Sequence, residues 1–266
     1  MIKISLNILV LSTVLLFNGC STKSIEYKDK KELIQKQNSI QSEEDSFLDE
    51  FEDEMQVEIK ADPLAKYNKA MTSFNDGLYE YVLGPVSKGY STVVHKEIRE
   101  SVNKFFHNIF YPIRLVNNLL QGKFKNASEE TGRFVINTTI GVFGLFDPAR
   151  SQFNLEPHNE DFGQTLGYWG VKAGPHIVLP FLGPSNIRDA LSLYPDSYLS
   201  ATEYYENRGF NLTHNYGESL LLKAYEKVNY VSLNPDEYQK LKEDAVDLYP
   251  YLRDVYEQYR EKLIEE

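Results

Sequence analysis

Four residues with metal-binding side chains crowd into six positions near the middle of the chain. They are Glu156, His158, Glu160 and Asp161. Carboxylates and imidazoles bind hard and borderline metal ions, so the cluster is a candidate metal site. Its spacing matches none of the helix-borne zinc motifs, and His176 is the nearest other histidine that follows. We therefore expect no metal, and we expect His158 and Asp161 to hydrogen-bond their loop to its neighbours.

Motifs for covalent or phosphate chemistry are absent from the sequence. There is no Gly-x-Ser-x-Gly elbow of a lipase or esterase, and no Gly-x-x-x-x-Gly-Lys-Ser/Thr phosphate loop. Ser, His and Asp occur, but no local pattern links them into a triad. We therefore predict no catalytic residues and no cofactor.

The stretch from Leu155 to Asp189 makes an unusual structural demand. Residues 173–187 contain no Asp, Glu, Lys or Arg, yet Pro175, Pro180 and Pro184 interrupt them, so one continuous helix is not expected. Such a segment must be buried in protein or line a cavity, because lipid cannot satisfy its irregular backbone. The flanking helices are expected to bury this segment or to form the cavity that it lines.

Arg188 and Asp189 open the helix that follows this stretch. As a surface ion pair they would contribute little to stability. The alternative is that Arg188 meets the phosphate of a lipid, which a guanidinium binds well.

Composition limits the class of protein. The 266 residues suffice for one large domain or two small ones, and 42% hydrophobic residues can fill a core. The formal net charge of -11 argues against nucleic acid as a partner. Cys20 is the only cysteine, which excludes an intramolecular disulfide and a multi-cysteine metal site.

The N-terminus has the layout of a secretory signal. Lys3 supplies the basic region, residues 4–17 are uncharged and mostly apolar, and a glycine precedes Cys20. The apolar run is too short to cross a bilayer, which needs ~20 apolar residues. We predict a lipoprotein signal peptide over residues 1–19 and lipidation of Cys20, with palmitate among the acyl groups. Ser21 instead of Asp favours the outer membrane, and an ordinary signal with a chance cysteine is the alternative.

Residues 20–61 are predicted to be the lipidated N-terminus and a flexible acidic linker. Residues 43–54 contain eight acidic side chains and no basic one, and such a block repels itself and stays solvated. Phe47, Leu48 and Phe51 interrupt the block, so a docking motif is the alternative.

Residues 62–266 are predicted to form a single, mainly α-helical domain. Apolar residues recur at spacings of three and four, and few segments alternate with period two. Asp62 and Pro63 begin the first helix, and Gly84 and Pro85 end it. Further helices are expected over residues 96–110, 112–121, 126–146, 185–193, 211–231, 235–248 and 250–264.

Two groups of apolar residues within these helices are expected either to be buried in the core or to contact membrane lipid. In the helix over 96–110, the residues expected to face inward are Ile98, Val102, Phe105, Phe106 and Ile109. Residues 134–146 form an uncharged run of thirteen, too short to span a membrane but long enough for one leaflet or a core. Periodicity favours a buried helix there, whereas the lipoprotein start favours membrane contact.

Several short motifs lie along residues 62–266. The strongest are Asp161-Phe162-Gly163-Gln164-Thr165-Leu166-Gly167, Trp169-Gly170-Val171, Gly174-Pro175, Leu179-Pro180-Phe181-Leu182-Gly183-Pro184 and Arg188-Asp189. Others are Asp62-Pro63-Leu64, Phe74-Asn75, Gly132-Arg133-Phe134, Gly144-Leu145-Phe146-Asp147 and Tyr249-Pro250-Tyr251. With these motifs the chain resembles the MlaA (VacJ) family of outer-membrane phospholipid-transport lipoproteins. It departs from the family at Tyr67-Asn68-Lys69, where Phe-Asn-Arg is usual, and in its longer acidic linker.

The resemblance implies a helical ring in the inner leaflet of the outer membrane, with a central amphipathic channel. One leaflet is ~15 Å thick, close to the ~10–12 Å diameter of a helix lying flat, so helices too short to span would fit there. Moving a charged headgroup past hydrocarbon is costly, and a channel that is partly polar would lower that barrier.

The resemblance also implies a function and partners. The function is non-enzymatic removal of mislocalised phospholipids from the outer leaflet and their transfer to the periplasm, which maintains lipid asymmetry. The implied partners are phospholipid, a trimeric porin, a periplasmic lipid carrier and an inner-membrane ABC transporter. The protein would be lipid-anchored and would face the periplasm. A secreted lipid hydrolase and a structural lipoprotein that tethers envelope layers are the alternatives.

Residues for lipid contact are suggested on the same grounds. The channel or lipid-binding candidates are Asn68, Phe74, Asn75, Leu179, Pro180, Phe181, Leu182, Gly183, Pro184 and Arg188, with the first three expected to set a gate. The candidates for membrane contact are Phe143, Leu145 and Phe146.

Overall fold

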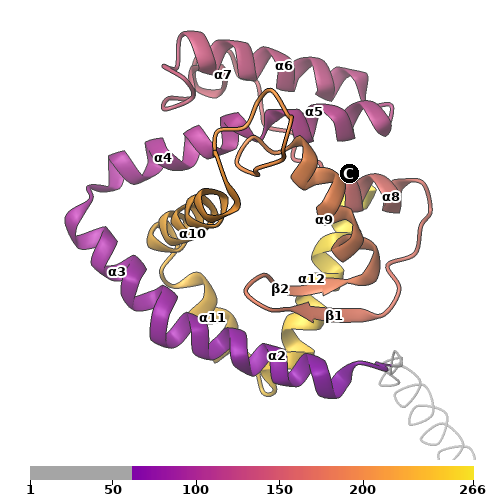
Figure 1. Ribbon diagram of the computed structural model, residues 1–266. Coiled ribbons are helices and arrows are strands. Elements are labelled where there is room, and N and C mark those ends of the chain that lie inside the picture. Colours follow the sequence, from indigo (N-terminus) through magenta and orange to yellow (C-terminus); the bar gives the residue numbers. More distant parts are fainter. Residues whose placement is uncertain (1–61) are drawn as a thin grey trace, which may run out of the picture. The chain divides into compact units, whose positions relative to one another are not determined.

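The computed structural model describes residues 62–266, and the structural statements that follow concern this part of the chain. The prediction of a mainly α-helical fold is confirmed, because helices are joined by only one two-stranded sheet in the described residues. In Figure 1, helices α2 to α5 follow one another around the centre, α6 lies outside α5, and α9 and α12 are on the other side. The amphipathic channel itself stays a prediction. The signal peptide, Cys20 and the acidic linker lie outside the described residues.

The first helical run is longer than predicted. It consists of α2 (Ala65–Leu78), a π-helical turn η1 (Tyr79–Leu83) and α3 (Gly84–Val93). The prediction that Gly84 and Pro85 end the helix is therefore wrong. The N–H of Gly84 bonds to the carbonyl oxygen of Tyr79, five residues back, so the register has already shifted when Pro85 enters the first turn of α3. A proline is tolerated in a first turn, where its missing N–H costs nothing.

The bounds of the next helices agree with the predicted bounds as far as residue 139. Helices α4 (Lys96–Ile109) and α5 (Tyr111–Leu120) lie where they were expected, and α6 (Phe124–Thr139) packs against α5. The predicted helix over 126–146 is wrong in its second half, because the chain turns after α6. A single short helix, α7 (Pro148–Ser151), then leads into the central stretch.

The central stretch forms a short helix and a hairpin. Helix α8 (Phe162–Tyr168) begins at Asp161, which caps it by accepting a bond from the N–H of Gln164 at 2.8 Å. Strands β1 (His176–Leu179) and β2 (Gly183–Asn186) pair antiparallel, with Leu179 opposite Gly183. These strands are too short to produce a clear period-two pattern, and prolines at the turn hide them further.

The remaining helices complete the described chain. Helix α9 (Ile187–Leu199) is capped by Asn186, not by Ser185 as predicted, and it continues past the predicted end at 193 despite Pro195. It is followed by α10 (Tyr216–Leu233), α11 (Glu237–Glu243) and α12 (Leu248–Glu265). The last lies near its predicted range, whereas α10 begins five residues later and α11 ends five residues earlier than predicted.

Buried positions in the described residues are mostly polar. The most deeply buried side chains include Asn68, Asn117, Asn118, Glu130 and Asn229. Buried polar groups must find hydrogen-bond partners, so directional contacts fix how these helices pack. Of the apolar residues expected to face inward from α4, Phe106 is buried, but the prediction for Ile98 is wrong because that side chain is 54% exposed.

Candidate functional site

One asparagine of α2 holds the tip of the β1–β2 hairpin. The Nδ2 of Asn75 donates to the carbonyl oxygen of Leu179 at 2.9 Å, and its Oδ1 accepts from the N–H of Phe181 at 2.8 Å. The rings of Phe74 and Phe181 meet edge to face with 5.4 Å between their centroids. The structure therefore brings together four of the predicted lipid-site residues from two distant parts of the chain.

A second asparagine of α2 holds the base of the hairpin. The Nδ2 of Asn68 donates to the carbonyl oxygen of His176 at 3.1 Å, and its Oδ1 accepts from the N–H of Val178 at 2.9 Å. The same Nδ2 donates to the hydroxyl of Tyr249 on α12. Residues seven apart lie on one face of a helix, so Asn68 and Asn75 present two amides along β1 where a third strand would otherwise pair.

The hairpin tip leaves apolar side chains uncovered. Phe181 is 67% exposed, Leu182 is 68% exposed, and Pro180 is exposed as well. Phe181 has a φ of 66°, which costs a non-glycine residue ~1–3 kcal/mol and persists only where neighbours fix it. The bond from Phe181 to Asn75 is one such constraint.

Arg188 lies in a buried ion cluster at the start of α9. Its Nε donates to Asp189 at 2.8 Å, and its Nη1 donates to the carbonyl oxygen of Val171 at 3.3 Å. Asp189 also accepts from the hydroxyl of Tyr256 and pairs with Arg260. Burial alone would raise the pKa of Asp189, but the bond from Arg188 and the charge of Arg260 lower it. This placement favours a packing role for Arg188 over contact with a phosphate.

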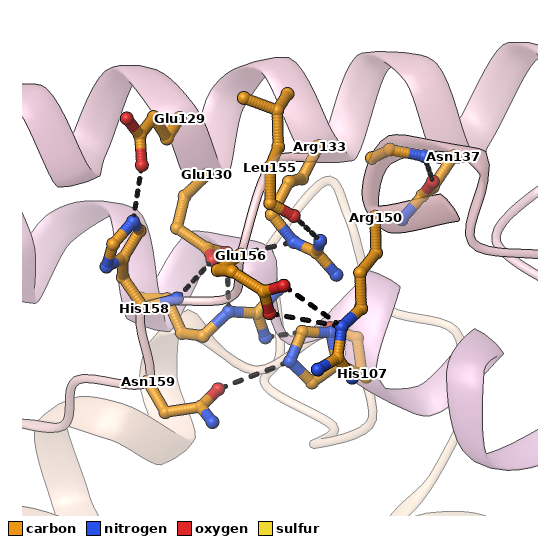
Figure 2. A network of polar contacts seen from close by, with 12 residues as sticks. His107, Glu129, Glu130, Arg133, Asn137, Arg150, Leu155, Glu156, His158 and Asn159 are labelled. Atoms are coloured by element: carbon orange, nitrogen blue, oxygen red, sulfur yellow. Dashed lines mark hydrogen bonds and ion pairs between the residues drawn. The ribbon is translucent and has the colours of Figure 1, made fainter. Parts of the chain in front are cut away.

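The candidate metal-binding side chains point away from one another and bond to different partners. Glu156 pairs with Arg150 on the surface, while the Nε2 of His158 lies 2.6 Å from Glu129. The N–H of His158 also donates to Glu130 at 2.7 Å, as Figure 2 shows. His158 therefore fastens its loop to α6, as the sequence predicted.

The other two candidate ligands face helices α5, α6 and α12. Glu160 pairs with Lys123 at 2.7 Å and accepts from the amide of Gln121. Asp161 receives both terminal nitrogens of Arg260, at 2.6 and 2.9 Å. Within residues 62–266 no group of His, Cys, Asp and Glu is arranged to hold a metal ion.

A buried network on α5 and α6 escaped the sequence analysis. Glu130 accepts from the Nε of Arg114 at 2.7 Å and lies 3.8 Å from the Nε of Arg133. Arg133 in turn reaches Asp147, which also accepts from the amide of Asn137. Figure 2 shows the side chains of Glu130 and Arg133 pointing toward one another from α6. The only sequence signal was the charged pair at 130 and 133, which on its own is typical of a solvated helix face.

Two titratable side chains near residues 159–162 have displaced pKa values. Burial and the charge of Arg114 lower the pKa of His107 to about 4, although its ring bonds to Asn159. Burial raises the pKa of Asp196 to about 6, although it accepts bonds from the N–H of Phe162 and the amide of Asn117.

The residues predicted for membrane contact follow α6 in a strained turn. Val142 and Phe143 have φ values of 53° and 57°, unfavourable for side chains with a Cβ. Gly144 packs so closely on Asn108 that an added Cβ would lie 2.4 Å from its side chain. The turn leaves Phe143 70% and Phe146 57% exposed, with Leu145 partly covered.

The described surface is rich in large apolar side chains. Besides the hairpin tip and the turn after α6, the uncovered residues include Val93, Phe124, Trp169, Leu191, Leu220 and Leu221. Exposed apolar patches mark contacts with a membrane or a partner. No helix in residues 62–266 has both the length and the apolar character needed to cross a bilayer.

A helical fold that buries many polar side chains and exposes many large apolar ones is typical of proteins that contact a membrane or a partner. Comparison with known families makes the class specific. The chain belongs to the MlaA lipoprotein family, whose model matches residues 60–263.

Individual relatives agree with this assignment. A Rickettsia typhi protein is 36% identical over 152 residues, which are 57% of this chain and 60% of that protein. The intermembrane phospholipid transport system lipoprotein MlaA of Haemophilus influenzae is 36% identical, over 54% of this chain and 61% of the relative. The chain thus spans about three fifths of the length of these relatives.

A solved structure also has the same fold. It is described as "Structural basis for maintenance of bacterial outer membrane lipid asymmetry". Its chain matches with a TM-score of 0.63 and 26% identity, over 77% of this chain and 100% of that one.

Proposed function

We propose that this protein is an outer-membrane lipoprotein that removes mislocalised phospholipids from the outer leaflet and passes them to a periplasmic carrier. It thereby maintains lipid asymmetry, and it does so without enzymatic chemistry. The family supports this proposal, since the Haemophilus influenzae relative is an intermembrane phospholipid transport lipoprotein.

The observation that carries the proposal is the inverted distribution of side chains. The largest fully buried side chains are four asparagines, one glutamate and Val178, whereas Phe143, Phe181 and Leu182 are more than half exposed. In water, each Å² of exposed apolar surface costs ~25 cal/mol of free energy. This cost is removed where the surface contacts lipid. Lipidation of Cys20 would hold this surface at the membrane.

The hairpin tip is the proposed point of lipid contact and gating. Asn75 fixes the tip to α2 through two backbone bonds, and Phe74 and Phe181 present their rings beside it. Residues 179–184 border the proposed channel, and Asn68 sets the position of β1. Loosening either amide would change how far the tip reaches toward lipid.

The proposed partners follow from the energetics of lipid transfer. A lipid that leaves a bilayer needs an apolar environment at each step, so a periplasmic carrier must receive it. An energised inner-membrane ABC transporter would set the direction of flow. A trimeric porin would hold the lipoprotein in the outer membrane, where exposed apolar helices such as α10 could contact it.

The test is surface phospholipid in cells that lack the protein, measured by chemical modification of outer-leaflet lipids and by detergent sensitivity. We expect surface phospholipid to rise, and we expect wild type but not Cys20→Ala to restore it. An unchanged surface phospholipid content in the deletion strain would reject the proposed function.

A further inference from the structure

A cavity of about 430 Å³ lies between the start of α6, the loop before α8 and the end of α12. Its lining includes Lys123, Glu160, Asp161, Tyr259 and Arg260. The hairpin residues predicted for the channel do not line it. The cavity is therefore a separate place at which the described chain can hold a ligand.

The lining carries two cationic side chains, Lys123 and Arg260, and three carboxylates, Glu160, Asp161 and Glu266. Two of these carboxylates form ion pairs with the cations. The Nζ of Lys123 lies 2.7 Å from Glu160, and Arg260 grips Asp161 with both terminal nitrogens. The side chains of Glu160 and Arg260 are 7% and 10% exposed, so solvent screens their charges weakly. Burial would raise the pKa of Asp161, but Arg260 lowers it, so the carboxylate stays charged at neutral pH.

The cavity also has hydrogen-bonding capacity to spare. A lysine ammonium has three N–H donors, and Glu160 engages one donor of Lys123. The amide of Asn126 and the hydroxyl of Tyr259 line the cavity, and neither has a hydrogen-bond partner among the described residues. Donors for an anion therefore lie beside carboxylates that attract a cation.

Large aromatic side chains lie close to Lys123 in sequence or in space, although they are not part of the cavity lining. Phe124 is 70% exposed and Trp169 is 68% exposed, and the indole N–H of Trp169 donates to the carbonyl oxygen of Leu120 at 3.0 Å. The ammonium of Lys123 lies 5.7 Å from the ring centre of Tyr168. Tryptophan and tyrosine beside a charged pocket suit the boundary between a headgroup and its acyl chains.

We propose that this cavity binds the zwitterionic headgroup of a phospholipid, with the phosphate at Lys123 and the ammonium group at Glu160 and Asp161. This inference rests on the proposed function and deepens it by naming a headgroup class, phosphoethanolamine. An anionic headgroup without an ammonium would meet three carboxylates that repel it. A choline group has no N–H to donate to them.

The single tryptophan of the 266-residue chain, Trp169, supplies the readout. The full-length chain in a nonionic detergent is titrated with dihexanoyl phosphatidylethanolamine while tryptophan emission is recorded. We expect a saturable change, and about tenfold weaker binding of the phosphatidylglycerol and phosphatidylcholine analogues. Lys123→Gln should weaken binding of the ethanolamine lipid about tenfold, the usual effect of losing one charge-assisted bond.

Lys125→Gln is the matched control, because Lys125 lies two residues further along in the first turn of α6, is 85% exposed in its side chain and does not line the cavity. Tyr259→Phe tests the site without breaking either ion pair, and should weaken binding several-fold even where Lys123→Gln lowers stability. Equal binding of the glycerol lipid, or wild-type affinity in both Lys123→Gln and Tyr259→Phe, would overturn the proposal.

Soluble glycerophosphoethanolamine distinguishes a lipid from a free zwitterion. We expect it to bind much more weakly than the dihexanoyl lipid, because it has no chains to lie on Phe124 and Trp169. Equal affinity of the two would reject the lipid assignment. Failure of the wider function would instead appear as unchanged surface phospholipid in deletion cells, a result that leaves these binding constants unaffected.

Discussion

The N–H of Phe181 donates a hydrogen bond to the Oδ1 of Asn75 at 2.8 Å, across 106 positions of sequence. The Nδ2 of the same amide donates to the carbonyl oxygen of Leu179. One side chain thus satisfies two backbone groups at the exposed turn of the hairpin, groups that would otherwise be free to rearrange. The position of the apolar tip consequently depends on α2, and a change in either element moves the other.

Replacing Asn75 with alanine should release the hairpin tip. Each lost hydrogen bond is worth about 1 kcal/mol, so the backbone amide of Phe181 should exchange its hydrogen about tenfold faster or more. Hydrogen exchange with mass spectrometry would measure this. Ser73→Ala is the control, because its hydroxyl bonds only to Lys69 on its own helix. Unchanged exchange over residues 179–183 would show that other contacts hold the tip.

Replacing Glu130 with glutamine should destabilise the whole described fold. Glu130 is fully buried between Arg114 and Arg133, and removing its charge leaves the buried guanidinium of Arg114 without a carboxylate partner, while Arg133 keeps only its pair with Asp147. The expected loss is ~3–5 kcal/mol in the free energy of unfolding, measured by denaturant titration. Glu129→Gln next to it should cost under ~1 kcal/mol, because its pair with His158 is partly exposed. Equal losses would contradict the assignment of Glu130 as the centre of the network.

His107 should make the protein sensitive to mild acid. Burial lowers its pKa from 6.5 to about 4, so the unfolded chain takes up the proton first. Its contribution to stability is present above pH 6.5 and is lost as the pH falls toward 4. Wild type should therefore lose a few kcal/mol relative to His107→Gln over this range, measured by denaturant titration at several pH values.

Asp196 has the opposite effect to His107 on how stability changes with pH, over part of the same pH range. Its pKa is raised to about 6, so the folded state takes up a proton there and gains stability as the pH falls from 6 toward 4. The comparison must accordingly be made between variants. A constant difference between wild type and His107→Gln at all pH values would refute the assignment to His107.

Replacing Phe143 and Phe146 with aspartate should weaken docking to membranes. Both rings are more than half exposed in the turn after α6, and two new charges would have to be desolvated against lipid. We expect at least tenfold weaker binding of a non-lipidated form to liposomes in a flotation assay. Ser151→Asp with Gln152→Asp adds the same charge at nearby exposed polar positions and should bind nearly as well as wild type. Unchanged binding of the phenylalanine double variant would reject the assignment.

Much of the local structure was predictable because it depends on near neighbours in sequence. Helix α4 follows from apolar spacing alone, and helices α5 and α12 follow from apolar spacing and from a proline in the first turn. The first helix was predicted too short, because a π-helical turn that accommodates Pro85 leaves no pattern in the residues. The end of α6 at Thr139 was missed since two apolar residues adopt positive φ, which side-chain type alone does not indicate.

The sequence by itself determined the family, through motifs such as Phe74-Asn75 and the residues from Leu179 to Pro184, and it determined the mainly helical class. Only the tertiary structure decided that Asn75 clasps the hairpin, that Arg188 is paired and buried, and that Glu130 joins α5 to α6. The reason is physical. A helix is stabilised by contacts within a few residues, whereas a buried polar group is defined by its partner, which the chain brings from a distant position only on folding.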